Sequence, residues 1–148
     1  MNTLDLETIQ NLIDHISQIA TEHDILITWV NGLAPTTPSV CDGKNIILMN
    51  INYRPINALP FILCHEIAHC LHQDGRYLTL AQRQNINAID YHSEGQANQL
   101  ALELLLKAYK KSFNQDNNEI NICSFMHNLV IPSKLEQPLK RLLIKSVS

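Results

Sequence analysis

The segment His65-Glu66-Ile67-Ala68-His69 combines two imidazoles and a carboxylate at a spacing that suits metal chemistry. On a helix, residues four apart lie on the same face, so His65 and His69 can bind one metal ion. Glu66 lies next to His65, within reach of a water molecule bound to that ion. The pattern H-E-x-x-H therefore predicts a metal-dependent hydrolase, most simply a peptidase. His65 and His69 would be metal ligands, and Glu66 would be the catalytic base.

The motif lies in the middle of a predicted helix, as this chemistry requires. Asn57 is a suitable N-cap, Pro60 is tolerated in a first turn, and Gly75 can end the helix after about residue 73. Together with Ile62, the three motif residues follow the i, i+3, i+4, i+7 spacing of one helix face. Ionisable groups thus occupy a stripe that an amphipathic helix normally gives to apolar residues. A bound metal ion would offset the cost of burying them.

A catalytic zinc site needs a third protein ligand and an open position for water. The metzincin continuation is excluded, because His72 and Gly75 stand where that class has a glycine and a histidine. Glu94 is the candidate third ligand, near the start of a helix predicted from about residue 90 to 111. It shares a stripe with mostly apolar residues, although a carboxylate near a helix start can also simply complement the helix dipole. Asn98, one turn later, could hold a ligand by a hydrogen bond.

The remaining elements predict an α+β fold with a small three-stranded antiparallel sheet. Apolar residues at helical spacing indicate an amphipathic helix over residues 4–21, and β-branched and aromatic residues indicate a strand over 24–30. Residues 39–41 and 44–51 flank Asp42-Gly43, a sequence typical of a two-residue hairpin turn. Two short helices divided by Ile131-Pro132-Ser133 are expected near the C-terminus.

Length and composition favour one domain of 148 residues, about 45% of them hydrophobic. We expect residues 1–112 to carry the N-terminal helix, the sheet and the active-site helices, and residues 113–148 to form a C-terminal helical extension. Eleven Lys and Arg against fourteen Asp and Glu give a net charge of -3, which argues against direct nucleic-acid binding. Neither a signal peptide nor a membrane span is visible, so a cytoplasmic location is expected. Cys64 and Cys70, beside the motif histidines, are expected to pack as small apolar groups.

A strand and a hairpin, then H-E-x-x-H, then E-x-x-A-N-x-x-A-x-x-L-L resemble the ImmA/IrrE family of metallopeptidases. The residues that carry the resemblance are His65, Glu66, His69, Glu94, Ala97, Asn98, Ala101, Leu104 and Leu105. The late segment from Phe125 to Glu136 is also similar to C-terminal regions of phage and prophage members. The chain departs from the family pattern at Gln96 and at Leu106-Lys107, and neither departure touches an expected ligand.

The resemblance implies a zincin-like helical core with a zinc ion held by His65, His69 and Glu94, although manganese is an alternative occupant. It also implies a protein substrate, a helix-turn-helix repressor of a phage or mobile element, which the enzyme cleaves or antagonises to derepress that element. Tyr91 and His92, next to Glu94, are candidate groups around the site, and Tyr53 and Tyr77 flank the motif helix. The alternative hypothesis is a non-catalytic module that binds the repressor and has a structural or vestigial metal site.

Overall fold

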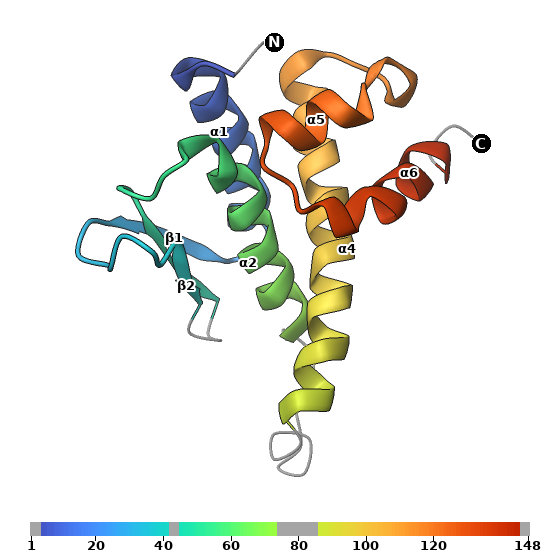
Figure 1. Ribbon diagram of the computed structural model, residues 1–148. Coiled ribbons are helices and arrows are strands. Elements are labelled where there is room, and N and C mark those ends of the chain that lie inside the picture. The colour runs from blue at the N-terminus through green and yellow to red at the C-terminus, as the bar shows by residue number, and fades with distance from the viewer. Residues whose placement is uncertain (1–3, 42–44, 74–85, 146–148) are drawn as a thin grey trace.

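The fold is mixed and mostly helical, as the sequence predicts. The computed structural model describes residues 4–41, 45–73 and 86–145, without the side chains of residues 40, 41, 72, 73, 86–94, 96 and 145. The helices and strands, coloured in chain order in Figure 1, are α1 (Leu6–Glu22), β1 (Leu26–Val30), β2 (Ser39–Cys41), β3 (Ile46–Asn50), α2 (Leu59–Gln73), α4 (Ile86–Phe113), α5 (Ile122–Asn128) and α6 (Glu136–Lys145).

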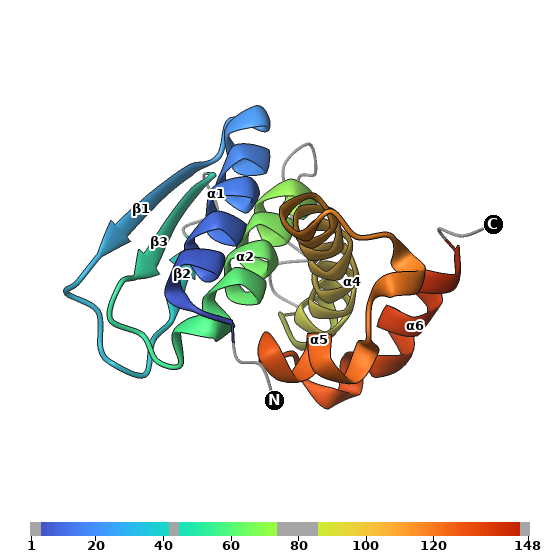
Figure 2. The ribbon, with the colours of Figure 1, turned by 90° about the horizontal axis from the view of Figure 1, so that it is seen from above.

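Three helices form the centre of the molecule. Helices α1, α2 and α4 pack against one another, and α4 makes its most extensive contacts with α2. The sheet covers the α1 and α2 side of this layer, whereas α5 and α6 lie on the other side, near α4 (Figure 2). Within the described ranges, no helix is both long and apolar enough to cross a membrane.

The predicted N-terminal helix is confirmed as α1. Asp5 caps it, because its carboxylate accepts a hydrogen bond of 2.8 Å from the Thr8 backbone N–H. The apolar positions at helical spacing, Ile9, Leu12 and Ile16, are fully buried in the core. Helix α1 thereby packs its apolar face against α2 and α4.

The three-stranded antiparallel sheet predicted from the sequence is wrong in its pairing. The strand order is β1-β3-β2, with β3 antiparallel to β2 but parallel to β1. The strands alternate in direction along the chain, as in a simple meander, but β3 inserts between the other two. The sheet is therefore mixed, and β2 becomes an edge strand that packs against α2.

The hairpin register also differs from the prediction. A two-residue turn at Asp42-Gly43 would place Cys41 opposite Lys44, whereas Cys41 lies opposite Ile47. The turn itself is outside the described residues. Antiparallel pairing of the two predicted strands is confirmed, but the Asp-Gly signal does not set their register.

Asn50, the last residue of β3, holds the loop through which the chain passes from β1 to the edge strand β2. Its side-chain amide is fully buried and donates to the carbonyl oxygens of Ala34 at 3.2 Å and Thr37 at 3.0 Å. Its Oδ1 accepts from the Asn52 backbone N–H at 2.9 Å. These bonds hold the loop between β1 and β2 across the end of β3. The buried amide of Asn50 thus has a partner for both its NH2 group and its oxygen, which offsets the cost of removing it from water.

The predicted helix around the motif is confirmed as α2, with Pro60 in its first turn, but Asn57 does not cap it. Asn57 lies within a short 3-10 helix, Ile56–Ala58, that precedes α2. Its side-chain amide donates to the carbonyl oxygen of Asn128 at 2.6 Å. This hydrogen bond ties the entrance of α2 to the end of α5, a contact 71 residues distant in sequence. The two short C-terminal helices, α5 and α6, are confirmed on either side of Ile131-Pro132-Ser133.

Replacing Asn50 by Asp should destabilise the protein strongly, because a carboxylate cannot donate to the carbonyl oxygens of Ala34 and Thr37. We expect the free energy of unfolding to fall by about 3 kcal/mol, because a buried carboxylate at position 50 would face two carbonyl oxygens without a donor between them. Urea denaturation followed by circular dichroism measures this change. Asn52→Asp is the matched control, because Asn52 is exposed and should tolerate the same change. Equal stability of the two variants would contradict the role of Asn50.

Candidate metal centre

Helix α2 has a buried apolar face and a partly buried face that carries the motif. Leu63, Cys64, Ile67 and Ala68 are fully buried and fix one face in the core. The three motif residues lie on the opposite side and are only partly buried. The helix is thus anchored by its apolar face, so that the imidazoles and the carboxylate are held at the surface of the core in a defined orientation.

The two motif histidines converge on one point. His65 Nε2 and His69 Nε2 are 3.1 Å apart, and the ring centroids are 4.6 Å apart. Two nitrogen ligands about 2.0–2.1 Å from a tetrahedral zinc ion are roughly 3.3 Å apart, so the pair nearly has the spacing of a bidentate zinc site. One ligand atom from each of His65, Glu66 and His69 lies within 4.8 Å of the others. The donor set and its geometry therefore fit a metal ion.

Glu66 has a partner that the sequence analysis missed. The Ser39 hydroxyl, at the start of β2, donates to Glu66 Oε2 at 2.7 Å. This bond occupies one carboxylate oxygen and leaves the other for a second partner. No local sequence signal identifies Ser39, because its proximity to α2 depends on β2 being the edge strand beside that helix.

The motif opens into a cleft with a volume of about 390 Å³. Besides the motif face of α2, its walls come from Pro38 and Ser39 on the sheet side and from Asn98 on α4. Pro132 and Lys134, in the segment between α5 and α6, complete the rim. Asn98 lines the same cleft as the motif residues, whereas a hydrogen bond from Asn98 to a ligand stays a prediction. Pro132 and Lys134 were not anticipated.

The remaining candidate residues fall where side chains are not described. Glu94, Tyr91 and His92 belong to α4, and His72 belongs to α2, but their side chains lie outside the described residues. Glu94 precedes Asn98 by one helical turn, so the backbone places both on the same face of α4. That face reaches the cleft at Asn98. The backbone position of Glu94 is thus compatible with a ligand role, and that role stays a prediction.

The cysteines beside the motif belong to the core, as predicted. Cys64 and Cys70 are buried, and burial raises the pKa of the Cys64 thiol far above its ordinary value. Cys64 is one of the fully buried residues on the core face of α2, so it packs there as a small apolar group.

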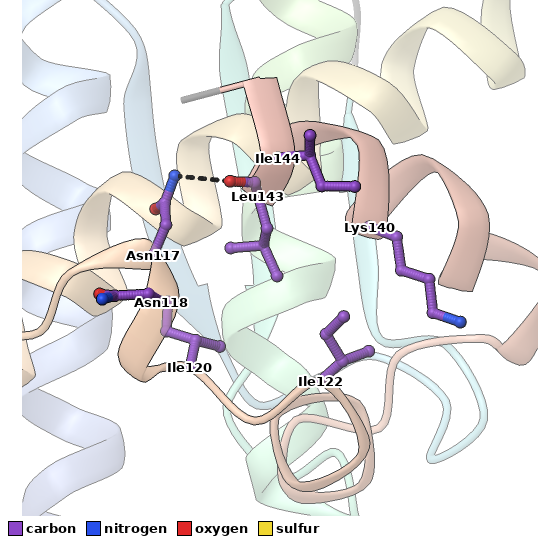
Figure 3. Close-up of a pocket in the computed structure, with 7 residues that line it drawn as sticks. All are labelled: Asn117, Asn118, Ile120, Ile122, Lys140, Leu143 and Ile144. Carbon is purple, nitrogen blue, oxygen red and sulfur yellow. Dashed lines mark hydrogen bonds between the residues drawn. The ribbon is translucent and has the colours of Figure 1, made fainter. Parts of the chain in front are cut away.

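A larger cavity of about 680 Å³ lies near the end of α6 (Figure 3). Its wall is mainly aliphatic, with Ile120 and Ile122 facing Leu143 and Ile144. Lys140, a cation at its edge, forms an ion pair of 2.9 Å with Glu136. Among the described residues that line this cavity there is no group of potential ligands or bases, so the smaller cleft is the better candidate for chemistry.

Comparison with known proteins identifies no relative of this chain. No protein-family model, curated protein or solved structure matches the chain. The function is therefore inferred from the motif residues and from the geometry around them.

Replacing Ser39 by Ala should weaken the attachment of β2 to α2, because the hydrogen bond to a carboxylate is lost. We expect the free energy of unfolding of metal-free protein to fall by about 1 kcal/mol. A double-mutant cycle with Glu66→Ala isolates the interaction, and should give a coupling energy of similar size. Additive effects of the two substitutions would show that the bond contributes nothing to stability.

Proposed function

We propose that this protein is a zinc-dependent endopeptidase of the ImmA/IrrE type, with a zincin-like core. The observation that carries the proposal is the 3.1 Å approach of the two histidine Nε2 atoms, next to the carboxylate of Glu66. A structural zinc site normally closes all four positions with protein ligands, often thiolates. Here the two thiols next to the motif in sequence, Cys64 and Cys70, are buried in the core, and the motif faces a cleft instead. This arrangement favours a catalytic site.

In this proposal, His65, His69 and Glu94 hold the metal ion, with manganese as an alternative to zinc. When bound, the ion supplies a Lewis acid that lowers the pKa of a coordinated water molecule toward about 7. Glu66 accepts a proton from the attacking water and passes it to the departing amine of the cleaved peptide bond. The hydrogen bond from Ser39 fixes one oxygen of Glu66, so that the other can face the water. The chemistry needs no further titratable residue of the described cleft.

The proposed substrate is a helix-turn-helix repressor of a phage or mobile element, as the resemblance to the ImmA/IrrE family implies. Cleavage would inactivate the repressor directly. Formation of a stable complex without cleavage would instead favour a non-catalytic module that binds the repressor. The two functions are distinguished by whether new peptide termini appear.

Glu66→Gln should abolish peptide cleavage and leave the metal content unchanged, because the amide cannot accept the proton from water. We expect a loss of roughly 10²-fold or more in turnover, the usual contribution of a general base. Mass spectrometry of a peptide library and of candidate repressors, incubated with the zinc-loaded chain, measures cleavage. Glu103→Gln is the matched control, because Glu103 is an exposed residue of α4 outside the cleft. Full turnover by the Glu66 variant would refute the mechanism.

Glu94→Ala should lower the zinc content of the purified chain, because two histidines alone leave the site without its third ligand. Elemental analysis of protein purified without chelator should give about one zinc per wild-type chain. Glu103→Ala, on the same helix, should retain the wild-type content. Unchanged zinc in the Glu94 variant would remove Glu94 from the site, and metal-free protein in every case would mean that the motif does not bind zinc.

A further inference from the structure

The rim of the cleft carries a cation whose backbone is held firmly in place. Lys134 lies in a 3-10 helix, Ser133–Leu135, between α5 and α6. Ile131 and Leu135 on either side are buried. The Ile131 backbone N–H donates to the Met126 carbonyl oxygen, and the Leu135 N–H donates to that of Pro132, each at 2.9 Å. Lys134 is therefore presented to the cleft from a fixed position, although its own side chain is exposed.

The charge of Lys134 is not compensated within the described part of the chain. No ion pair or hydrogen bond joins its ammonium group to another residue there, whereas Lys140 on α6 is paired with Glu136. Among the described residues that line the cleft, Lys134 is the one Lys or Arg. Glu66 is the one carboxylate, and it is engaged by Ser39. Among the described residues that line the cleft, Lys134 is therefore a positive charge without an ion-pair partner.

The rest of the cleft supplies apolar surface. Phe61 and Ile62 precede the motif on α2, and Pro38 and Pro132 lie on the two opposite rims. A peptide bound across the motif would thus meet apolar side chains and, at one edge, a single ammonium group. Carboxylates are the groups of a peptide that complement an ammonium group.

We propose that Lys134 is a specificity-determining residue that binds a carboxylate of the peptide substrate. The preferred substrate is then a segment with an apolar residue next to an acidic group, which is either an Asp or Glu side chain or a free C-terminus. This inference rests on the proposed function, because it assumes that the cleft binds peptides. It adds a substrate class that the metal-binding motif by itself does not specify.

Peptide binding to the full-length Glu66→Gln variant, loaded with zinc, tests the inference without turnover. The probes are fluorescein-labelled Gly-Ser decapeptides with a central Leu-Asp or Leu-Asn pair, each with a free or an amidated C-terminus. Fluorescence anisotropy should show about fivefold tighter binding of the peptides that carry the recognised carboxylate, and the advantage should shrink at high salt. If the Asn peptides lose this advantage, the recognised carboxylate is a side chain. If the amidated peptides lose it, the recognised carboxylate is the C-terminus.

Three variants in the Glu66→Gln background assign the preference to Lys134. Lys134→Gln should remove it and Lys134→Arg should retain it. Arg141→Gln, the matched control, should leave it unchanged, because Arg141 is an exposed cation of α6 outside the cleft. Equal affinity for all four peptides, no detectable binding of any of them, or a preference that survives Lys134→Gln would overturn the inference. Cleavage by the wild-type chain tests the proposed function separately. If the cleft prefers acidic peptides but never cleaves them, the inference about Lys134 stands and only the proposed peptidase activity is refuted.

Discussion

The structure depends on one helix that belongs to the core and to the candidate site at once. Helix α2 is clamped on its apolar side by α1 and α4, where Leu63, Ile67 and Ala68 are fully buried. Because a helix is rigid, fixing that side also fixes His65 and His69 on the other. Core packing thus fixes the position of the motif face, and the four-residue spacing on the helix brings the two Nε2 atoms to 3.1 Å of each other. A cavity on the buried side of α2 would be expected to disturb the site directly.

The sheet and the C-terminal segment turn this exposed helix face into a cleft. Asn50 holds the loop between β1 and β2 across the end of the central strand, and the chain then enters β2 at the edge beside α2. Ser39 is thereby brought to Glu66. On the other side, the bond from Asn57 to Asn128 ties the start of α2 to the end of α5, just before the segment that carries Lys134. Two buried or half-buried amides therefore position both rims.

The sequence predicted the elements whose signal is local. The apolar spacing of Ile9, Leu12 and Ile16 indicated α1, and the single stripe formed by Ile62 and the motif residues indicated α2, because helical periodicity is a property of consecutive residues. The face shared by Glu94 and Asn98 was likewise predictable, and Asn98 does reach the cleft. The local signal failed at Asp42-Gly43 and at Asn57. The preference of two residues for a turn cannot set a register that three strands share. The side chain of Asn57 does not cap α2 because it donates to the Asn128 carbonyl oxygen at the end of α5.

By itself, the sequence predicted the chemistry: which imidazoles could share a metal ion and which carboxylate could act as a base. Those assignments need only the 3.6-residue repeat of one helix. The tertiary structure alone decided that β1 and β3 are parallel, that Ser39 holds Glu66 and that Lys134 borders the cleft. Each of these joins residues far apart in the chain. Such contacts are selected by the burial of the whole core, and no local pattern of residues encodes them.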